Sequence, residues 1–339
     1  MSAACILGCA GQALGADERA FFREVRPWGF ILFARNLGDA GQVRRLVEDL
    51  REAAGDERAL VFIDQEGGRV QRLRPPLARN RRPAALFGSL WRKRPEEAEE
   101  AVRLNHRLLA HELAALGIDA DCAPCLDLRV PGAHDIVGDR SFSAEPNAVA
   151  ALGRAAIDGL LAGGVAPVVK HIPGHGRAGA DSHFDLPVVG TPEAVLEQTD
   201  FAPFRALADA AMAMTAHVVY SAVDPDLCAT LSRRVIGTVI RGFIGFDGLL
   251  MTDDLSMKAL GGTFEDRARG ALDAGCDVLL HCNGDMGEMR AVASAAPELS
   301  GRAAERAAAA RGVARRSQTF DAAAAEARLA DLGLEGRLA

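Results

Sequence analysis

The chain has 339 residues, of which 49% are hydrophobic and 25% are charged. This is ordinary globular composition, and the length is enough to bury a large core, so a disordered protein is excluded. The net charge is −7 and the basic residues are scattered along the chain. A phosphate backbone requires a concentrated basic surface, so we expect no nucleic-acid partner.

The chain begins with MSAACILGCAGQ, in which the apolar stretch is short and no basic segment precedes it. This pattern predicts a first strand and not a signal peptide. No run approaches the roughly 18 apolar residues that are needed to span a bilayer. We therefore expect a protein without a membrane partner that stays in the cytoplasm.

Seven cysteines lie in apolar, strand-like segments, which are Cys5, Cys9, Cys122, Cys125, Cys228, Cys276 and Cys282. An odd number in such surroundings indicates reduced, buried thiols and no disulfide framework. Cys122 and Cys125 form a CxxC, but Pro124 separates them and no second CxxC follows. We expect neither a metal nor a redox role for this pair.

Short apolar runs alternate with helical stretches along the chain. The runs are residues 4–9, 29–33, 60–64, 118–123, 166–170, 212–217, 248–252 and 277–281. Continuous apolar runs of this length are typical of strands buried on both faces of a parallel sheet. Between them, Gln42 to Ala53 and Glu96 to Leu116 carry helical apolar spacing.

Eight such units over about 280 residues predict an α/β fold of the (β/α)₈ TIM-type barrel. We expect one domain over residues 1–339, with C-terminal helices from about residue 298 packed on its exterior. A doubly wound sheet also alternates strands and helices, but it usually carries a glycine fingerprint after the first strand. Only AGQALG follows Cys9.

Polar, glycine-rich segments follow several of the predicted strands, where the active sites of such barrels lie. The densest is KHIPGHGRAGADSH, from Lys170 to His183, which holds three histidines. Asp181 and His183 are separated by one residue. The carboxylate can therefore accept a hydrogen bond from the imidazole if the loop turns, and such a pair raises the basicity of the ring.

A second segment, LLMTDDLSM, places Asp253 where an apolar strand ends, so that its carboxylate should point into the barrel mouth. Asp254 should face elsewhere because side chains alternate along a strand. We expect only one of the two to be catalytic, and we favour a helix N-cap for Asp254.

Two further segments supply acids and guanidinium groups around the same mouth. FIDQEGGRVQRL carries Asp64, Glu66, Arg69 and Arg72, and HDIVGDRSFS carries Asp139 and Arg140. Either arginine-bearing segment could simply pair with surface acids. Such a cluster is nevertheless suited to a polyhydroxylated sugar, because each hydroxyl offers both a donor and an acceptor.

Taken together, KHIPGHG followed by DSH, TDDLSM, DQEGGRVQR and GDRSF resemble the glycoside hydrolase family 3 β-N-acetylglucosaminidases. The likeness covers nearly the whole barrel, with five motifs in the same order. It is closest to the compact, single-domain bacterial enzymes of cell-wall recycling. One departure is His281, where the family usually has an apolar residue.

The resemblance implies a retaining exo-β-N-acetylglucosaminidase acting on terminal N-acetylglucosamine of peptidoglycan (muropeptide) fragments. By the same resemblance, Asp253 is the nucleophile and His183 the acid/base, oriented by Asp181. The residues implied to bind the sugar are Asp64, Arg72, Arg140, Lys170 and His171. We expect no cofactor, no metal and no partner other than the carbohydrate, and nothing demands more than a monomer.

Retaining glycosidases generally use two carboxylates, and here a histidine replaces one of them. Asp253 would attack the anomeric carbon, while His183 protonates the leaving oxygen and later deprotonates water. Because His183 rides a glycine-rich loop, we expect it to move into place when sugar binds. A neutral imidazole repels an anion less than a carboxylate does, so the same residues are also compatible with a β-glycoside phosphorylase.

The histidines are compatible with two further functions. A metal-dependent barrel hydrolase could use ligands from His171, His175, Asp181, His183 and His217. A sugar-binding barrel without chemistry is the second, although both catalytic positions are occupied. We interpret His106 and His111 as structural from their helical context, while His217, which ends the sixth predicted strand, fits either role.

Overall fold

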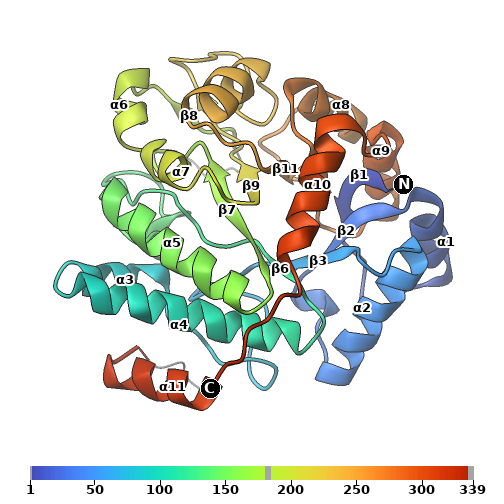
Figure 1. Ribbon diagram of the computed structural model, residues 1–339. Coiled ribbons are helices and arrows are strands. Elements are labelled where there is room, and N and C mark those ends of the chain that lie inside the picture. Colours follow the sequence, from blue (N-terminus) through green and yellow to red (C-terminus); the bar gives the residue numbers. More distant parts are fainter. Residues whose placement is uncertain (1, 180–184, 335–339) are drawn as a thin grey trace.

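The computed structural model describes residues 2–179 and 185–334. Within them, eight parallel strands close into a barrel (Figure 1). In chain order these strands are β1 (Ala3–Leu7), β2 (Pro27–Leu32), β3 (Leu60–Ile63), β6 (Ala120–Asp121), β7 (Ala166–Ile172), β9 (Met212–Thr215), β11 (Leu249–Asp254) and β12 (Val278–His281). Each overlaps one predicted run, so the (β/α)₈ barrel is confirmed.

The strands are apolar along their whole length because both of their faces are buried. In β1, Ile6 points into the barrel interior with Trp28, Phe62 and Met212. The next residue, Leu7, packs instead in the cluster between the strands and the outer helices. This alternation explains why the sequence shows continuous apolar runs and not a strict two-residue pattern.

Helices surround the barrel (Figure 1). They are α1 (Ala16–Val25), α2 (Ala40–Ala54), α3 (Ala84–Trp91), α4 (Pro95–Ala114), α5 (Pro146–Ala162), α6 (Glu193–Gln198), α7 (Ala202–Ala206), α8 (Phe264–Ala274), α9 (Met286–Ala295), α10 (Gly301–Val313) and α11 (Ala322–Asp331). The two stretches with helical spacing correspond to α2 and α4. Asp39 caps α2 by accepting a hydrogen bond from the backbone N–H of Gln42 (2.9 Å), and Gly55 ends it with φ of 64°.

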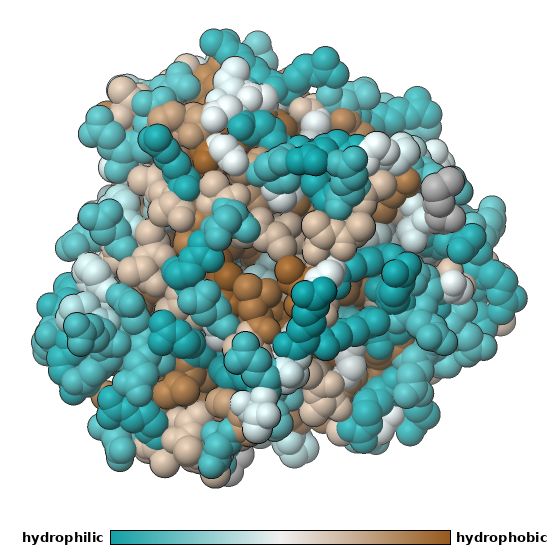
Figure 2. Space-filling model, in the orientation of Figure 1, coloured by the Kyte–Doolittle hydropathy of each residue, from teal (hydrophilic) through white to brown (hydrophobic). Residues whose placement is uncertain are grey.

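Helix α10 lies at the amino-terminal end of the strands. Ala307 and Ala310 of this helix belong to the same cluster as the barrel interior. The guanidinium of Arg311 lies 5.5 Å from the ring centre of Trp28, near the start of β2. Figure 2 shows that the face bearing α10 is mostly hydrophilic, with small apolar areas between the polar side chains. Helix α10 therefore covers the amino-terminal end of the barrel.

Short paired strands extend the wall at the carboxyl-terminal end of the barrel. β4 (Gln65–Gly67) and β5 (Val70–Gln71) form an antiparallel pair after β3, and β8 (Val188–Val189) pairs with β10 (Val219–Tyr220). The chain from β3 into β4 carries Asp64 and Glu66.

No helix within residues 2–179 and 185–334 has the length and apolar character needed to cross a membrane.

Candidate active site

One cavity of about 340 Å³ at the carboxyl ends of the strands is lined by the six described residues that the motifs assign to the nucleophile or to sugar binding. They are Asp64, Arg72, Arg140, Lys170, His171 and Asp253. They come from four different strands or the loops that follow them, and they are up to 189 positions apart in the sequence (253 − 64). The volume lies at the lower end of the range for small-ligand pockets, about 300–1,000 Å³. The barrel thus assembles a site for one small polar ligand.

Five charged side chains form a chain of alternating sign along one side of this cavity. Arg72 Nη2 lies 3.0 Å from Asp64 Oδ2, and Asp64 Oδ1 lies 2.7 Å from Lys170 Nζ. Lys170 Nζ is also 2.7 Å from Glu66 Oε1. Both oxygens of Glu66 then accept from Arg140, at 2.8 and 2.9 Å. Glu66 is therefore the link between two predicted sugar-binding residues.

The charges in this chain hold one another ionised despite their burial. Burial raises the pKa of Asp64, but Lys170 and Arg72 outweigh it and bring the pKa below its usual range. Burial likewise acts on Glu66, and Arg140 and Lys170 lower its pKa to about 2. Lys170 is 2% exposed, and the two carboxylates raise its pKa above its usual value although burial opposes this. The network is preformed and fully charged at neutral pH.

Asp253 lies near the end of β11 and is partly exposed to the cavity. Its Oδ1 accepts a hydrogen bond from the backbone N–H of Asp254 (2.8 Å), and its own N–H lies 3.4 Å from Thr215 Oγ1. Burial raises the pKa of Asp253. His171, His217 and this backbone N–H lower it by more than burial raises it, so the net shift is downward. The carboxylate is held ionised, as a nucleophile must be.

Asp254 does not cap a helix, so that interpretation was wrong. Its Oδ2 accepts from the Ser256 hydroxyl (2.6 Å), and its Oδ1 accepts from the backbone N–H groups of Ser256 (3.0 Å) and Cys282 (3.1 Å). The following helix α8 begins ten residues later (264 − 254) and is capped by Thr263. Asp254 therefore stabilises the turn after β11 and ties it to the end of β12, although it also borders the cavity.

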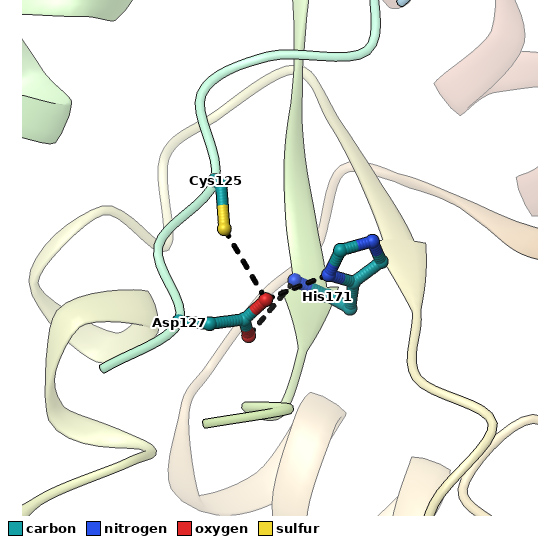
Figure 3. Close-up of side chains that lie close together, drawn as sticks. All are labelled: Cys125, Asp127 and His171. Atoms are coloured by element: carbon teal, nitrogen blue, oxygen red, sulfur yellow. Dashed lines mark hydrogen bonds and ion pairs between the residues drawn. The ribbon is translucent and has the colours of Figure 1, made fainter. Parts of the chain in front are cut away.

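His171, near the end of β7, is held by a carboxylate that the sequence motifs did not single out. Asp127 Oδ2 lies 2.7 Å from His171 Nδ1 and accepts from the Cys125 thiol at 3.3 Å (Figure 3). Asp127 Oδ1 accepts from the backbone N–H groups of His171 (3.2 Å) and His175 (2.6 Å). Asp127 follows the CxxC by two positions, and an acid inside an apolar strand-end segment is a signal by which it could have been found.

Within the described part of the chain, one group of side chains has donor atoms close enough together to fit metal ligands. Its members are Cys125, Asp127 and His171, and these atoms lie within 4.8 Å of one another. Their proximity follows from their mutual hydrogen bonds. Burial raises the pKa of the Cys125 thiol well above its usual value, so this thiol is a hydrogen-bond donor to Asp127. The arrangement suits a hydrogen-bond network better than a metal centre. All seven cysteines are buried and free, as expected.

His217 and His106 are both buried inside hydrogen-bond networks. His217 Nε2 donates to the backbone carbonyl of Asp254 (3.1 Å), and its Nδ1 lies 2.7 Å from Thr230 Oγ1. His106 Nδ1 contacts the carbonyl of Val102 in α4 (2.8 Å), and burial lowers the pKa of His106 to about 4. Both arrangements support structural roles, and His217 braces the strand end that carries the predicted nucleophile.

His281, the departure from the family pattern, faces away from the cavity. Its Nε2 lies 3.0 Å from Glu288 Oε2 in α9, and its ring packs edge-on against Phe264 in α8, with 5.6 Å between ring centres. The side chain has no exposed area. This histidine therefore fastens β12 to two outer helices.

The predicted acid/base His183 and its partner Asp181 lie outside the described residues. The described chain enters this loop from the end of β7 and returns toward β8. Gly174 has φ of 137°, in the region that favours glycine, and a Cβ at this position would lie 3.0 Å from the backbone oxygen of Asp200. The loop thus departs from the same strand that carries Lys170 and His171.

Comparison with known proteins gives the family. The profile described as "Glycosyl hydrolase family 3 N terminal domain" matches residues 16–315. The chain belongs to glycosyl hydrolase family 3. It is a glycoside hydrolase by this membership, and the resemblance drawn from the five motifs is confirmed.

Individual relatives agree with the family assignment. Beta-hexosaminidases of Alkalilimnicola ehrlichii and Thiobacillus denitrificans are 40% and 41% identical over 282 residues, covering 82% of this chain and 80% and 77% of theirs. The crystal structure of native NagZ from Neisseria gonorrhoeae is 32% identical, with a TM-score of 0.84 over 98% of this chain and 95% of that one. The same Neisseria protein has been solved in complex with N-trifluoroacetyl-D-glucosamine.

Proposed function

We propose that the chain is a retaining exo-β-N-acetylglucosaminidase that removes terminal N-acetylglucosamine from muropeptide fragments in the cytoplasm, as part of cell-wall recycling. One observation carries the proposal: the six described residues assigned to nucleophile and sugar binding line a single cavity. The beta-hexosaminidase relatives and the N-acylglucosamine complex of the Neisseria protein support the choice of sugar.

In the proposed reaction, Asp253 attacks the anomeric carbon and forms a covalent glycosyl-enzyme. Its position at a strand end fixes the carboxylate, and the bond from the Asp254 N–H to Oδ1 limits its rotation. The lowered pKa of Asp253 keeps the attacking oxygen ionised near neutral pH. The sugar C1–leaving-oxygen bond breaks as the Asp253 oxygen–C1 bond forms.

The acid/base in this scheme is His183, oriented by Asp181. His183 gives a proton to the leaving oxygen and, in the second step, takes one from water, which then displaces Asp253 from C1. The net configuration at C1 is retained because it is inverted twice. The second displacement returns the enzyme to its starting charge state.

The chain of charges on the cavity wall would hold the sugar ring. Asp64 accepts hydrogen bonds from hydroxyls, and Arg72, Arg140 and Lys170 donate to sugar oxygens. Because these groups are already paired with one another and with Glu66, they need not rearrange when a neutral sugar binds. A cavity of about 340 Å³ suits one terminal residue, which supports the exo mode of cleavage.

A substrate comparison tests the proposal. We expect release of 4-nitrophenol from the β-N-acetylglucosaminide and not from the β-glucoside, and cleavage of a muropeptide-type disaccharide. Activity on the glucoside alone would contradict the sugar assignment. Proton NMR of the first product should show the β anomer, and an initial α anomer would contradict retention.

Variants test the roles of the residues. Asp253→Asn should lower kcat by about a thousandfold or more, since a nucleophile is lost, while Asp226→Asn, at an exposed position, should match the parent. Adding inorganic phosphate distinguishes hydrolysis from phosphorolysis. We expect free sugar as the product, and accumulation of sugar 1-phosphate would identify a phosphorylase on the same site.

A further inference from the structure

The cavity wall contains a buried carboxylate–imidazole pair, Asp127 and His171, in which His171 is assigned to sugar binding and Asp127 has no proposed role. Asp127 has no exposed area, and the His171 side chain that it holds is 9% exposed and borders the cavity. Figure 3 shows the second ring nitrogen of His171 on the far side of the imidazole from Asp127. The small exposed part of this ring is therefore the part that a ligand can reach.

We propose that Asp127 is a positioning residue that fixes the tautomer of His171, so that its Nε2 is presented to the sugar as a hydrogen-bond acceptor. Asp127 accepts hydrogen bonds at both of its oxygens, and its pKa lies below the usual range although burial opposes this. An ionised carboxylate can only accept, so the proton of a neutral His171 must lie on Nδ1. The inference rests on the proposed function for the identity of the sugar alone.

The geometry at the other carboxylate oxygen makes this arrangement rigid. Two backbone N–H groups, of His171 and His175, point at Oδ1. Backbone donors cannot rotate away or become acceptors. An amide placed at this position must therefore turn its oxygen toward them, and its NH₂ group then takes the place of Oδ2, which faces His171 Nδ1 and the Cys125 thiol.

Asp127→Asn should consequently invert the tautomer of His171. Nδ1 then accepts from the new NH₂ group, the ring proton moves to Nε2, and the cavity is offered a donor in place of an acceptor. A sugar hydroxyl that donates to Nε2 in the parent then faces a donor, and it can keep this contact only by turning its own proton away from the ring. We expect KM to rise roughly 10- to 100-fold with a smaller change in kcat, as for the loss of one hydrogen bond in a buried site.

The matched control is Cys125→Ala. It removes the thiol donor at 3.3 Å from Asp127 Oδ2, but it leaves the charge and the other three bonds of the carboxylate in place. We expect KM to stay within about threefold of the parent, since a thiol is a weak donor. Equal losses in the two variants would show that the wall is merely structural and would overturn the proposal.

Nitrogen-15 NMR of the imidazole rings supplies a readout that does not depend on activity. The His171 signals, assigned by their absence in His171→Gln, should show the Nδ1–H form in the parent above the titration range and the Nε2–H form in Asp127→Asn. If Asp127→Asn does not fold, the tautomer of His171 in the parent spectrum still tests the proposal. An Nε2–H ring in the parent overturns the proposal, whichever glycoside the enzyme cleaves.

Discussion

Replacing Lys170 by methionine removes the central cation of the charge chain. The Lys170 ammonium lies 2.7 Å from a carboxylate oxygen of both Asp64 and Glu66, and the residue is 2% exposed. Breaking a buried ion pair from one side costs about 3–5 kcal/mol. Because Asp64 keeps Arg72 and Glu66 keeps Arg140, we expect the lower end, a loss of about 3 kcal/mol in the free energy of unfolding.

Urea unfolding of Lys170→Met measures this loss, and Lys93→Met serves as its control. Lys93 is exposed, so the same substitution there should change the unfolding free energy by less than about 0.5 kcal/mol. In the double variant Lys170→Met/Glu66→Gln, the Glu66 carboxylate that would have lost its ammonium partner is removed as well. The double variant should therefore be more stable than the sum of the two single losses implies. A loss below about 1 kcal/mol in Lys170→Met, or strict additivity, would refute the view that Lys170 bridges the two acids.

Two other tests address the packing of helix α3 and the electrostatics of strand β6. Gly88→Ala would place a Cβ 1.6 Å from the carbonyl oxygen of Phe142, so melting should show a loss of about 1–3 kcal/mol, whereas Gly312→Ala, with no atom within 4 Å of its Cβ, should not destabilise. Burial raises the pKa of Asp121 to about 8. At pH values between the usual pKa of an aspartate and about 8, folding therefore takes up a proton. The contribution of Asp121 to the free energy of unfolding thus falls as pH rises. Asp121→Asn should therefore gain stability over the parent as pH rises from about 4 to about 8, and a constant difference would contradict this.

The sequence predicts the barrel well because burial on both faces leaves a direct mark on it. Each strand is a continuous apolar run, and the polar side chains that follow it collect at one end of a parallel barrel. Position in the sequence was therefore enough to bring Asp64, Lys170 and Asp253 to one cavity before any distance was known. β6 is the shortest strand of the barrel, with two residues, and its prediction as residues 118–123 was too long.

The partners of the site residues were harder to predict because they come from different strands. Asp127 and His171 are 44 positions apart and meet because β6 and β7 are neighbours in the barrel. The sequence places Glu66 near the barrel mouth, but its neighbours in the sequence do not show whether it is a surface acid. In the structure it is a buried link between Lys170 and Arg140. Hydrogen-bond partners of this kind depend on register and side-chain rotamers, which apolar periodicity does not encode.

Trapping the reaction intermediate tests the central claim most directly. The parent enzyme, incubated with a fluorinated N-acetylglucosaminide that forms the intermediate faster than it hydrolyses it, should gain the mass of one sugar residue. Peptide mapping should locate that mass on Asp253, and Asp253→Asn should stay unlabelled. A label on another side chain, or turnover of the probe without any covalent sugar, would contradict the assignment of Asp253 as the nucleophile.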